Sequence, residues 1–197
     1  MLVFLKENLV LLSVPKTGTT AYMDALKDHA DIVVANPPEL KHAPVFRYNR
    51  WFRPMFDKIF DKQPELVAVM REPVSWLGSW YRYRQRPYLD GKPTSTKDIS
   101  FDDFVRDYCR GKQPPYANVG SQAKFLEPQP NGCKVSHLFR YEALEDYRLF
   151  LQERLKVALQ PEQKNVSQSA DLTLSADVEA VLRRKYAPEF DLYNSIK

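Results

Sequence analysis

The sequence predicts an α/β fold in which a central, mostly parallel sheet is flanked by helices. Two continuous apolar segments, 9–14 and 65–70, have the composition of buried strands, and 134–141 reads as a third strand. Each of these segments is followed by one whose apolar residues recur at helical spacing. Strands that alternate with helices in this way are typical of largely parallel sheets.

The remaining elements are assigned from apolar spacing, prolines and capping residues. Residues 2–5 precede residues 6–8, which read as a hairpin or a bent entry into the first buried strand. The other elements, in chain order, are a helix over 19–29, a strand over 31–35, a helical segment over 47–60 broken or begun at Pro54, helices over 74–86, 101–110 (capped by Ser100), 119–127, 142–159 and 175–186 (capped by Ser175), and a short helix ending near Tyr193. The polar residues 87–100 read as a loop. We see no internal repeat and no long linker, and therefore expect a single domain over residues 1–197.

Composition narrows the classes of function. Of the 197 residues, 44% are hydrophobic and 27% are charged, which is typical of a folded globular protein. The formal net charge of +4 is compatible with an anionic ligand. No dense run of Lys and Arg is present, so we expect no nucleic-acid partner.

Cysteine and histidine usage gives no sign of a metal site. Cys109 and Cys133 lack the spacing of a disulfide framework, and the three histidines are too scattered to form a zinc ligand set.

The N-terminal residues lack a secretory pattern, and no apolar stretch approaches the roughly 20 residues needed to cross a bilayer. We therefore expect a cytoplasmic protein without a bound metal.

The segment after the first buried strand has the composition of an anion-binding loop. The first N–H groups of the helix that follows have no backbone partner and favour an anion, Gly18 allows close approach, and Lys16 supplies a positive charge. The loop is not a Walker A motif, which needs a glycine separated by four residues from a Gly-Lys pair, whereas here Gly18 follows Lys16. An ordinary strand-to-helix turn is the alternative interpretation at this point. The loop consists of Pro15, Lys16, Thr17, Gly18, Thr19 and Thr20.

A second charged loop begins at Arg71, directly after the strand predicted over 65–70. Ligands of open α/β sheets bind beyond the carboxyl ends of the strands, so we expect Arg71 and Lys16 at the same edge. Ser79 follows Arg71 by eight positions, and a guanidinium with a hydroxyl suits a phosphate group. The alternative is that Arg71 pairs with Glu72 or a sheet neighbour, and that Ser79 is a small residue on a packed helix face.

Together these two motifs resemble the donor-binding motifs of the PAPS-dependent sulfotransferases, where PAPS is 3′-phosphoadenosine 5′-phosphosulfate. Residues 15–20 are similar to the 5′-phosphosulfate loop of that family. Arg71 and Ser79 are similar to its 3′-phosphate signature, in which the arginine and the serine grip that phosphate. The resemblance implies a P-loop-like three-layer domain that transfers a sulfuryl group from PAPS and releases PAP, the desulfated product.

Three later stretches extend the resemblance, which spans the chain from about Val10 to Tyr193. Residues 138–144 are similar to a strand end of the family, and most of this stretch reads as core, so we assign it no catalytic role. Residues 164–167 are similar to a loop near the nucleotide, and residues 186–193 are similar to the closing helix.

The resemblance also implies catalytic roles. Lys16 would stabilise charge on the leaving phosphate, while Thr17 to Thr20 cradle the 5′-phosphosulfate. His42 is similar to the general base of the family, although Lys41 lies directly beside it rather than one residue further away. Glu39 is the reserve candidate for the base, and Lys41 is an alternative contact to the sulfonate. A packed or surface role is the other interpretation of His42.

Two other functions stay open. One is a P-loop nucleotide kinase-like enzyme, against which stand the missing Walker A order and the lack of a clear strand-end aspartate for Mg²⁺. The other is a non-catalytic nucleotide-binding protein. As the acceptor of a sulfuryl group, a small molecule or a carbohydrate-like molecule with a hydroxyl or amine fits. The aromatic and basic runs at 47–53 and 76–86 read as core, or as a wall for an anionic or sugar-like acceptor.

Overall fold

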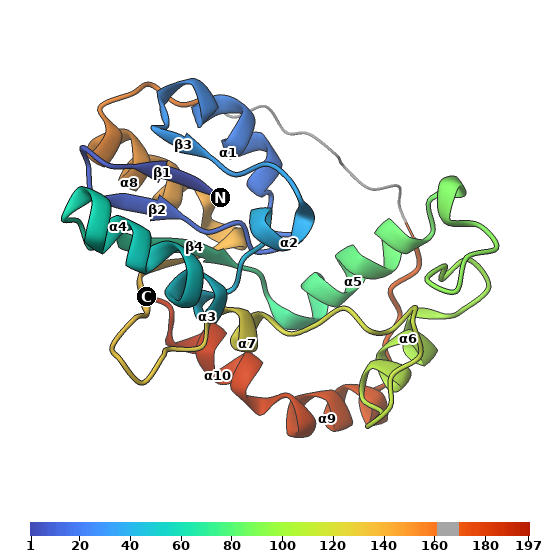
Figure 1. The fold of residues 1–197 in the computed structure, drawn as a ribbon. Helices are drawn as coiled ribbons and strands as arrows, with labels where there is room; N and C mark the ends of the chain where they lie inside the picture. Colours follow the sequence, from blue (N-terminus) through green and yellow to red (C-terminus); the bar gives the residue numbers. More distant parts are fainter. Residues whose placement is uncertain (161–169) are drawn as a thin grey trace. The chain divides into compact units, whose positions relative to one another are not determined.

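The structure of the protein is a computed structural model that describes residues 1–160 and 170–197 (Figure 1). The chain divides into two compact units, which are described separately here. The first contains Met1–Arg71, residues 122–160 and Ile196–Lys197, and the second contains Glu72–Ser121 and residues 170–195. The expectation of a single domain stays a prediction, and the stretch 164–167 singled out above lies outside the described residues.

The first unit is built on a five-stranded sheet with the order β3-β1-β2-β4-β5. The α/β class is therefore confirmed. The strands β2, β4 and β5 run parallel to one another, whereas β1 is antiparallel to both β2 and β3. The expectation of a mostly parallel sheet is wrong for half of these pairings. The strands are β1 (Leu2–Phe4), β2 (Leu9–Leu11), β3 (Ile32–Val33), β4 (Glu65–Met70) and β5 (Val135–Arg140).

The antiparallel orientation of β1 within the sheet has a local cause. Only a short turn separates β1 from β2, with Asn8 at a φ of +56°, and a connection this short can only join antiparallel neighbours. The strand β3 then pairs with the outer side of β1 and leaves β2 free to pair with β4. The hairpin is therefore confirmed, and it reverses β1 relative to β2. Since β3 is antiparallel to β1, it runs in the same direction as β2, β4 and β5, so β1 alone makes half of the pairings antiparallel.

Helices flank this sheet, with α8 and α4 lying on opposite sides of it in Figure 1. The helices α1 (Thr19–Leu26) and α8 (Leu144–Leu155) share one face, because Tyr22 and Tyr147 pack with alternate residues of β1, β2 and β4 in a single apolar cluster. The two tyrosine rings lie 4.7 Å apart between centroids. A short 3₁₀ turn (Lys27–His29) ends the first helical segment, and another (Tyr141–Ala143) precedes α8.

The predicted helical segment over 47–60 is formed by three consecutive helical elements. These are α3 (Val45–Arg47), a π-helical turn (Tyr48–Phe52) and α4 (Arg53–Phe60). Pro54 occupies the first turn of α4, where a missing N–H costs no helical hydrogen bond. The buried rings of Tyr48 and Phe56 stack with centroids 6.1 Å apart and anchor the segment. The remaining short helices of this unit are α2 (Pro38–Lys41) and α7 (Gln122–Leu126).

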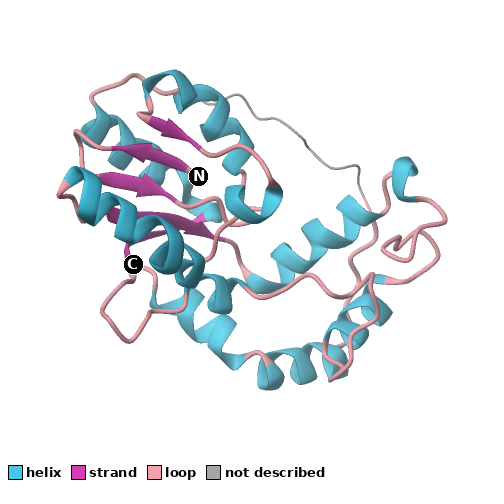
Figure 2. Ribbon diagram, in the orientation of Figure 1, coloured by secondary structure: helices cyan, strands magenta, loops and turns pink. Residues whose placement is uncertain are grey.

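The second unit is helical in its described residues (Figure 2). Its helices are α5 (Pro73–Arg84), α6 (Phe101–Tyr108), α9 (Ala176–Lys185) and α10 (Ala187–Ser195), with a 3₁₀ turn at Pro87–Leu89. Their apolar faces share one core that includes Trp76, Phe104 and Leu182. Glu72 caps α5, since its carboxylate accepts a hydrogen bond from the N–H of Ser75 at 2.7 Å.

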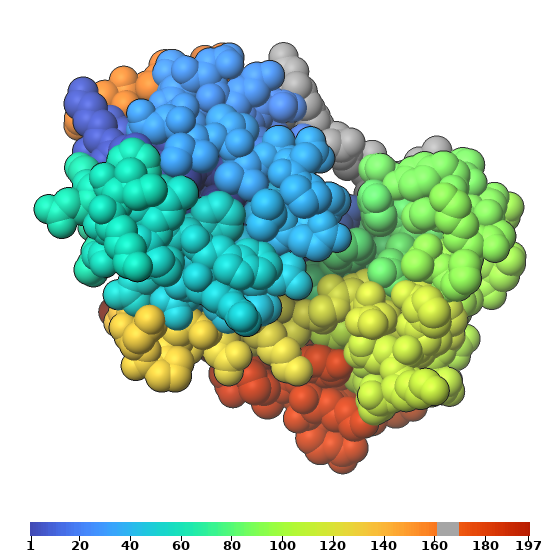
Figure 3. Space-filling view, viewed as in Figure 1, coloured from blue at the N-terminus to red at the C-terminus, as the bar shows by residue number. Residues whose placement is uncertain are grey.

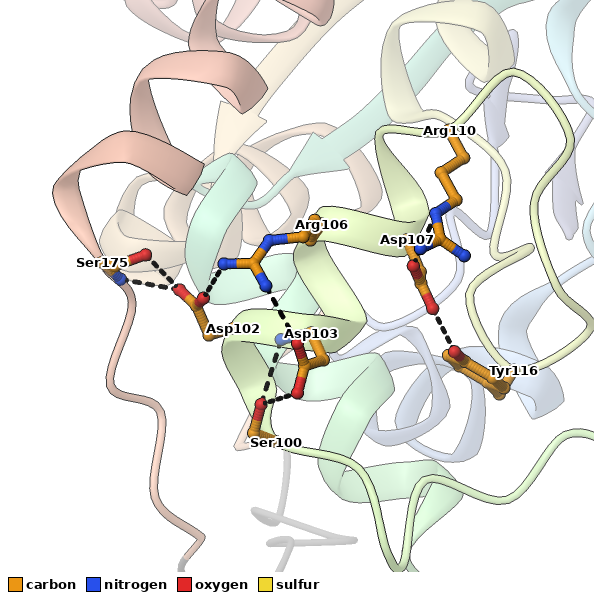
Figure 4. A network of polar contacts seen from close by, with 8 residues as sticks. All are labelled: Ser100, Asp102, Asp103, Arg106, Asp107, Arg110, Tyr116 and Ser175. Carbon is orange, nitrogen blue, oxygen red and sulfur yellow. Dashed lines mark hydrogen bonds and ion pairs between the residues drawn. The ribbon is translucent and has the colours of Figure 1, made fainter.

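A polar network organises the second unit around α6 (Figure 4). Ser100 caps α6 as predicted, accepting the N–H of Asp103 at 3.1 Å. Ser175 occupies the N-cap position of α9 as predicted, but its hydroxyl donates to Asp102 at 2.6 Å instead of accepting an N–H of α9. The carboxylate of Asp102 can accept from both the N–H and the hydroxyl of Ser175, which fastens the start of α9 to α6.

The structure also bears on the cysteines and on membrane-spanning helices. Cys109 and Cys133 are both buried free thiols. Among residues 1–160 and 170–197, no helix combines the length and the apolar character needed to cross a membrane.

Candidate functional site

The loop after β2 begins at the carboxyl edge of the parallel strands. Beyond the last assigned residue of β2, the N–H of Leu12 still donates to the carbonyl of Val67 on β4, at 2.9 Å. Lys16 and Gly18 then adopt left-handed conformations with φ of +67° and +73°. Gly18 immediately precedes α1 and its carbonyl accepts the N–H of Ala21 at 3.2 Å, so the N–H groups of Thr19 and Thr20 are those of the helix start that face this loop. A non-glycine residue at positive φ is uncommon, and such strain is concentrated at functional loops.

Thr17 stabilises the loop from within. Its side chain is buried, and its hydroxyl donates to the carbonyl of Val14 at 2.9 Å. That proton is therefore used inside the loop, and any contact from Thr17 to an anion would come from its N–H. Gly18 and Thr20 are exposed, and Pro15, Lys16 and Thr19 are half-buried, so Thr17 is the one buried residue of the loop.

The ring of Tyr141 connects this loop to Arg71. A Cβ atom placed on Gly18 would lie 3.2 Å from Cε2 of Tyr141, and the guanidinium carbon of Arg71 lies 4.4 Å from the centroid of the same ring. Arg71 directly follows β4 and Tyr141 directly follows β5, while the loop follows β2. The carboxyl ends of three adjacent parallel strands therefore meet at this ring, as expected for Lys16 and Arg71 at one edge.

Arg71 is held in place by its backbone. Its N–H donates to the side-chain oxygen of Gln122 at 2.9 Å, and its carbonyl accepts from the side-chain nitrogen of Gln122 at 2.8 Å. Gln122 is 1% exposed and begins α7, so this pair of bonds is buried and fixed. The half-buried guanidinium is thereby directed onto the ring of Tyr141.

His42 lies at the same strand end, directly after α2. Its Nδ1 is 2.6 Å from the carbonyl oxygen of Ser13, two residues before the loop. A carbonyl can only accept, so Nδ1 carries the proton and Nε2 presents a lone pair. Burial lowers the pKa of His42 below its ordinary 6.5, the bond to Ser13 opposes this, and the charges of Lys41 and the Met1 amino group lower it further. The imidazole is thus mainly neutral at pH 7.

The other predicted residues occupy different surroundings. Glu39 is exposed on α2, and its backbone carbonyl accepts a bond from the guanidinium of Arg47 at 3.3 Å. Lys41 is half-buried and directly precedes His42. Ser79 is 6% exposed within α5 of the second unit, and its role beside Arg71 stays a prediction.

Tyr141 is the residue that the sequence interpretation missed. The sequence places Tyr141 in the stretch 138–144, which reads mostly as core, although an aromatic residue directly after a parallel strand lies at the edge where ligands bind. Within the described parts of the chain, no group of three or more His, Cys, Asp and Glu side chains is placed to hold a metal ion. The arrangement thus offers hydrogen-bond donors for an anion, a guanidinium stacked on the ring of Tyr141, and the neutral imidazole of His42.

The chain was also compared with known proteins. No model of a protein family matches it, and no curated protein does either. The functional argument therefore rests on the geometry at the carboxyl edge of β2, β4 and β5.

Proposed function

We propose that this protein is a PAPS-dependent sulfotransferase, an enzyme that transfers a sulfuryl group from PAPS to a hydroxyl or amine of an acceptor. The observation that carries the proposal is the meeting of Gly18 and Arg71 at the ring of Tyr141. An anion-binding loop and a guanidinium at one sheet edge suit a donor that carries two separate phosphate-linked groups. The mixed sheet flanked by helices supports, as part of the same proposal, a P-loop-like three-layer domain.

The residues present fit the donor. The first-turn N–H groups of α1 and the ammonium of Lys16 suit the 5′-phosphosulfate, because both favour negative charge. Arg71 suits the 3′-phosphate, because a guanidinium donates two parallel hydrogen bonds to a phosphate. Its backbone bonds to Gln122 reduce the cost of holding it in place. PAPS supplies the sulfuryl group when bound.

Three tasks fall to the residues of this chain. Lys16 stabilises the negative charge that develops on the leaving phosphate oxygen. Nε2 of His42 takes the proton of the acceptor hydroxyl or amine, which its neutral state allows at pH 7. The carbonyl of Ser13 orients the ring for this step. Glu39 remains the reserve base, and its exposure on α2 makes it the less suited of the two.

Calorimetric titration with PAP and with ATP plus Mg²⁺ tests this proposal. Wild type, Arg71→Ala and Arg184→Ala are compared, the last removing an exposed arginine of α9. We expect tight PAP binding by wild type and by Arg184→Ala. We expect a loss of about 1.5–3 kcal/mol in Arg71→Ala, the range for a hydrogen bond to a charged group.

Each of the two alternative functions predicts a different result of this titration. Binding of ATP with Mg²⁺ and not of PAP would overturn the sulfotransferase proposal in favour of a kinase-like enzyme. Tight PAP binding without turnover of any acceptor would instead favour a nucleotide-binding protein that lacks catalysis.

A further inference from the structure

Exposed large hydrophobic side chains are concentrated on one segment of the first unit. Of the seven in the described chain, four lie on this segment, namely Phe46, Trp51, Ile59 and Phe60. Phe46 is 46% exposed and Trp51 is 47% exposed. In Figure 3 the same segment, in teal, lies on the visible surface of the first unit. Contiguous exposed apolar side chains are a feature of interaction surfaces, whereas singly scattered ones are ordinary, so contacts between these side chains decide which applies.

A guanidinium accompanies the two exposed rings. The guanidinium carbon of Arg47 lies 5.6 Å from the ring centroid of Phe46 and 5.7 Å from that of Trp51. One N–H of Arg47 is used by the carbonyl of Glu39, and a guanidinium has five N–H donors in all. Arg50 adds a second exposed positive charge, and no Asp or Glu occurs between residues 43 and 56. This surface is therefore both aromatic and cationic.

The helical segment that carries these side chains is anchored to the first unit. Its other face is anchored by Tyr48 and Phe56, which are 1% and 0% exposed. The π-helical turn over Tyr48–Phe52 widens the backbone between Arg47 and Trp51, and such turns are frequent at functional sites. A side chain held on a rigid helical platform loses little entropy when a ligand binds.

Contacts connect this surface to the candidate base. Arg47 donates to the carbonyl of Glu39 on α2, and α2 leads directly into His42. Nδ1 of His42 is in turn bonded to the carbonyl of Ser13, at the entry to the loop. A molecule that lies across Phe46, Arg47, Arg50 and Trp51 is therefore next to the element that carries the base.

We infer that these four residues, called here the Arg47 surface, bind the acceptor and that the acceptor is an anionic oligosaccharide, an inference that rests on the proposed function. Exposed rings stack on the C–H faces of sugars, and a guanidinium pairs bidentately with a carboxylate or sulfate. Small ligands are usually buried in closed pockets. The open face of a helix suits a chain of linked rings that carries charge at intervals.

Two matched probes test this inference. The first is an octasaccharide of alternating glucuronic acid and N-acetylglucosamine, and the second is the same octasaccharide with its carboxylates reduced to alcohols. We expect wild type to bind the charged probe at least about tenfold more tightly, as for a charge-assisted contact. Arg47→Ala and Trp51→Ala should each weaken that binding by about tenfold. Arg47→Lys keeps the positive charge but lacks the parallel N–H donors of a guanidinium, so it should retain only part of the wild-type affinity.

The controls remove similar groups elsewhere in the first unit. Lys6→Ala removes an exposed charge from the β1–β2 turn, and Leu149→Ala removes an exposed apolar side chain from α8. Both should bind the charged octasaccharide as wild type does. Equal binding of the two probes, or wild-type binding by Arg47→Ala and Trp51→Ala, would overturn the inference. Stronger binding of an octamer of glutamate would overturn it in favour of an acidic peptide.

A PAP titration of wild type, run beside these measurements, separates the two claims. PAP binding without octasaccharide binding overturns the acceptor inference and leaves the proposed function intact. Octasaccharide binding without PAP binding overturns the proposed function, and with it the role of the Arg47 surface as an acceptor site.

Discussion

Substitution of Gly18 by alanine tests the geometry of the loop most sharply. At a φ of +73° an alanine is strained by about 1–2 kcal/mol in the left-handed region. Its Cβ would also lie 3.2 Å from Cε2 of Tyr141, so the ring has to move by a few tenths of an ångström. We expect this displacement to add up to about 1 kcal/mol, the low end for overpacking, because the ring is only half-buried.

Gly91→Ala is the matched control. Gly91 has nearly the same φ, +72°, and a Cβ added there would meet nothing within 4 Å. Urea unfolding of both variants separates the backbone strain, which they share, from the contact with Tyr141. Because Tyr141 also contacts Arg71, we expect PAP affinity to fall in Gly18→Ala and to be unchanged in Gly91→Ala. If both variants lose the same stability and bind PAP as wild type does, the link from loop to ring to arginine is refuted.

The remaining predictions concern His42 and Asp107. We expect His42→Gln to reduce sulfuryl transfer by about 10²–10⁴-fold with PAP affinity nearly unchanged, whereas a parallel loss of PAP binding would indicate a structural role. The pKa of His42 is lowered below 6.5, and the neutral imidazole acts as the base, so wild-type activity should fall only as the pH drops below 6.5. A fall that begins above pH 6.5 would contradict the assignment of His42 as the base. Tyr116→Phe, which removes a donor to the buried carboxylate of Asp107, should cost about 1.5–3 kcal/mol in urea unfolding. Arg110→Ala, an exposed partner of the same carboxylate, should cost less than about 1 kcal/mol, and equal losses would contradict this difference.

The strands and helices around the site could largely be predicted from the sequence. The strand predicted over 65–70 has these bounds in the structure, because its apolar run is continuous and ends at a charged residue and a proline. The position of β3 beside β1 could not be predicted, because only two residues of β3 pair, and local composition does not encode the edge of the sheet that a strand joins. The β1–β2 hairpin reverses β1, and because β1 lies between β2 and β3, this one strand accounts for both antiparallel pairings.

In the candidate site, too, some residues could be predicted from the sequence and others could not. Lys16, Gly18, Arg71 and His42 could be singled out because each follows or lies near a predicted strand end. Tyr141 was missed, since an aromatic residue after an apolar strand has the same composition whether it is core or faces a ligand. The resemblance implies that Thr17 helps to cradle the 5′-phosphosulfate, whereas in the structure its hydroxyl bonds to the carbonyl of Val14 three residues earlier. Such contacts depend on the loop conformation, which the residue types alone do not define.

The most direct test of the account compares two nucleotides that differ only in the 3′-phosphate. Titration of wild type and of Arg71→Ala with PAP and with adenosine 5′-monophosphate gives the preference of each protein for that phosphate. The account predicts that wild type prefers PAP and that Arg71→Ala loses about 1.5–3 kcal/mol of this preference while its affinity for adenosine 5′-monophosphate is retained. An equal preference for PAP in both proteins would contradict the assignment of Arg71 to the 3′-phosphate.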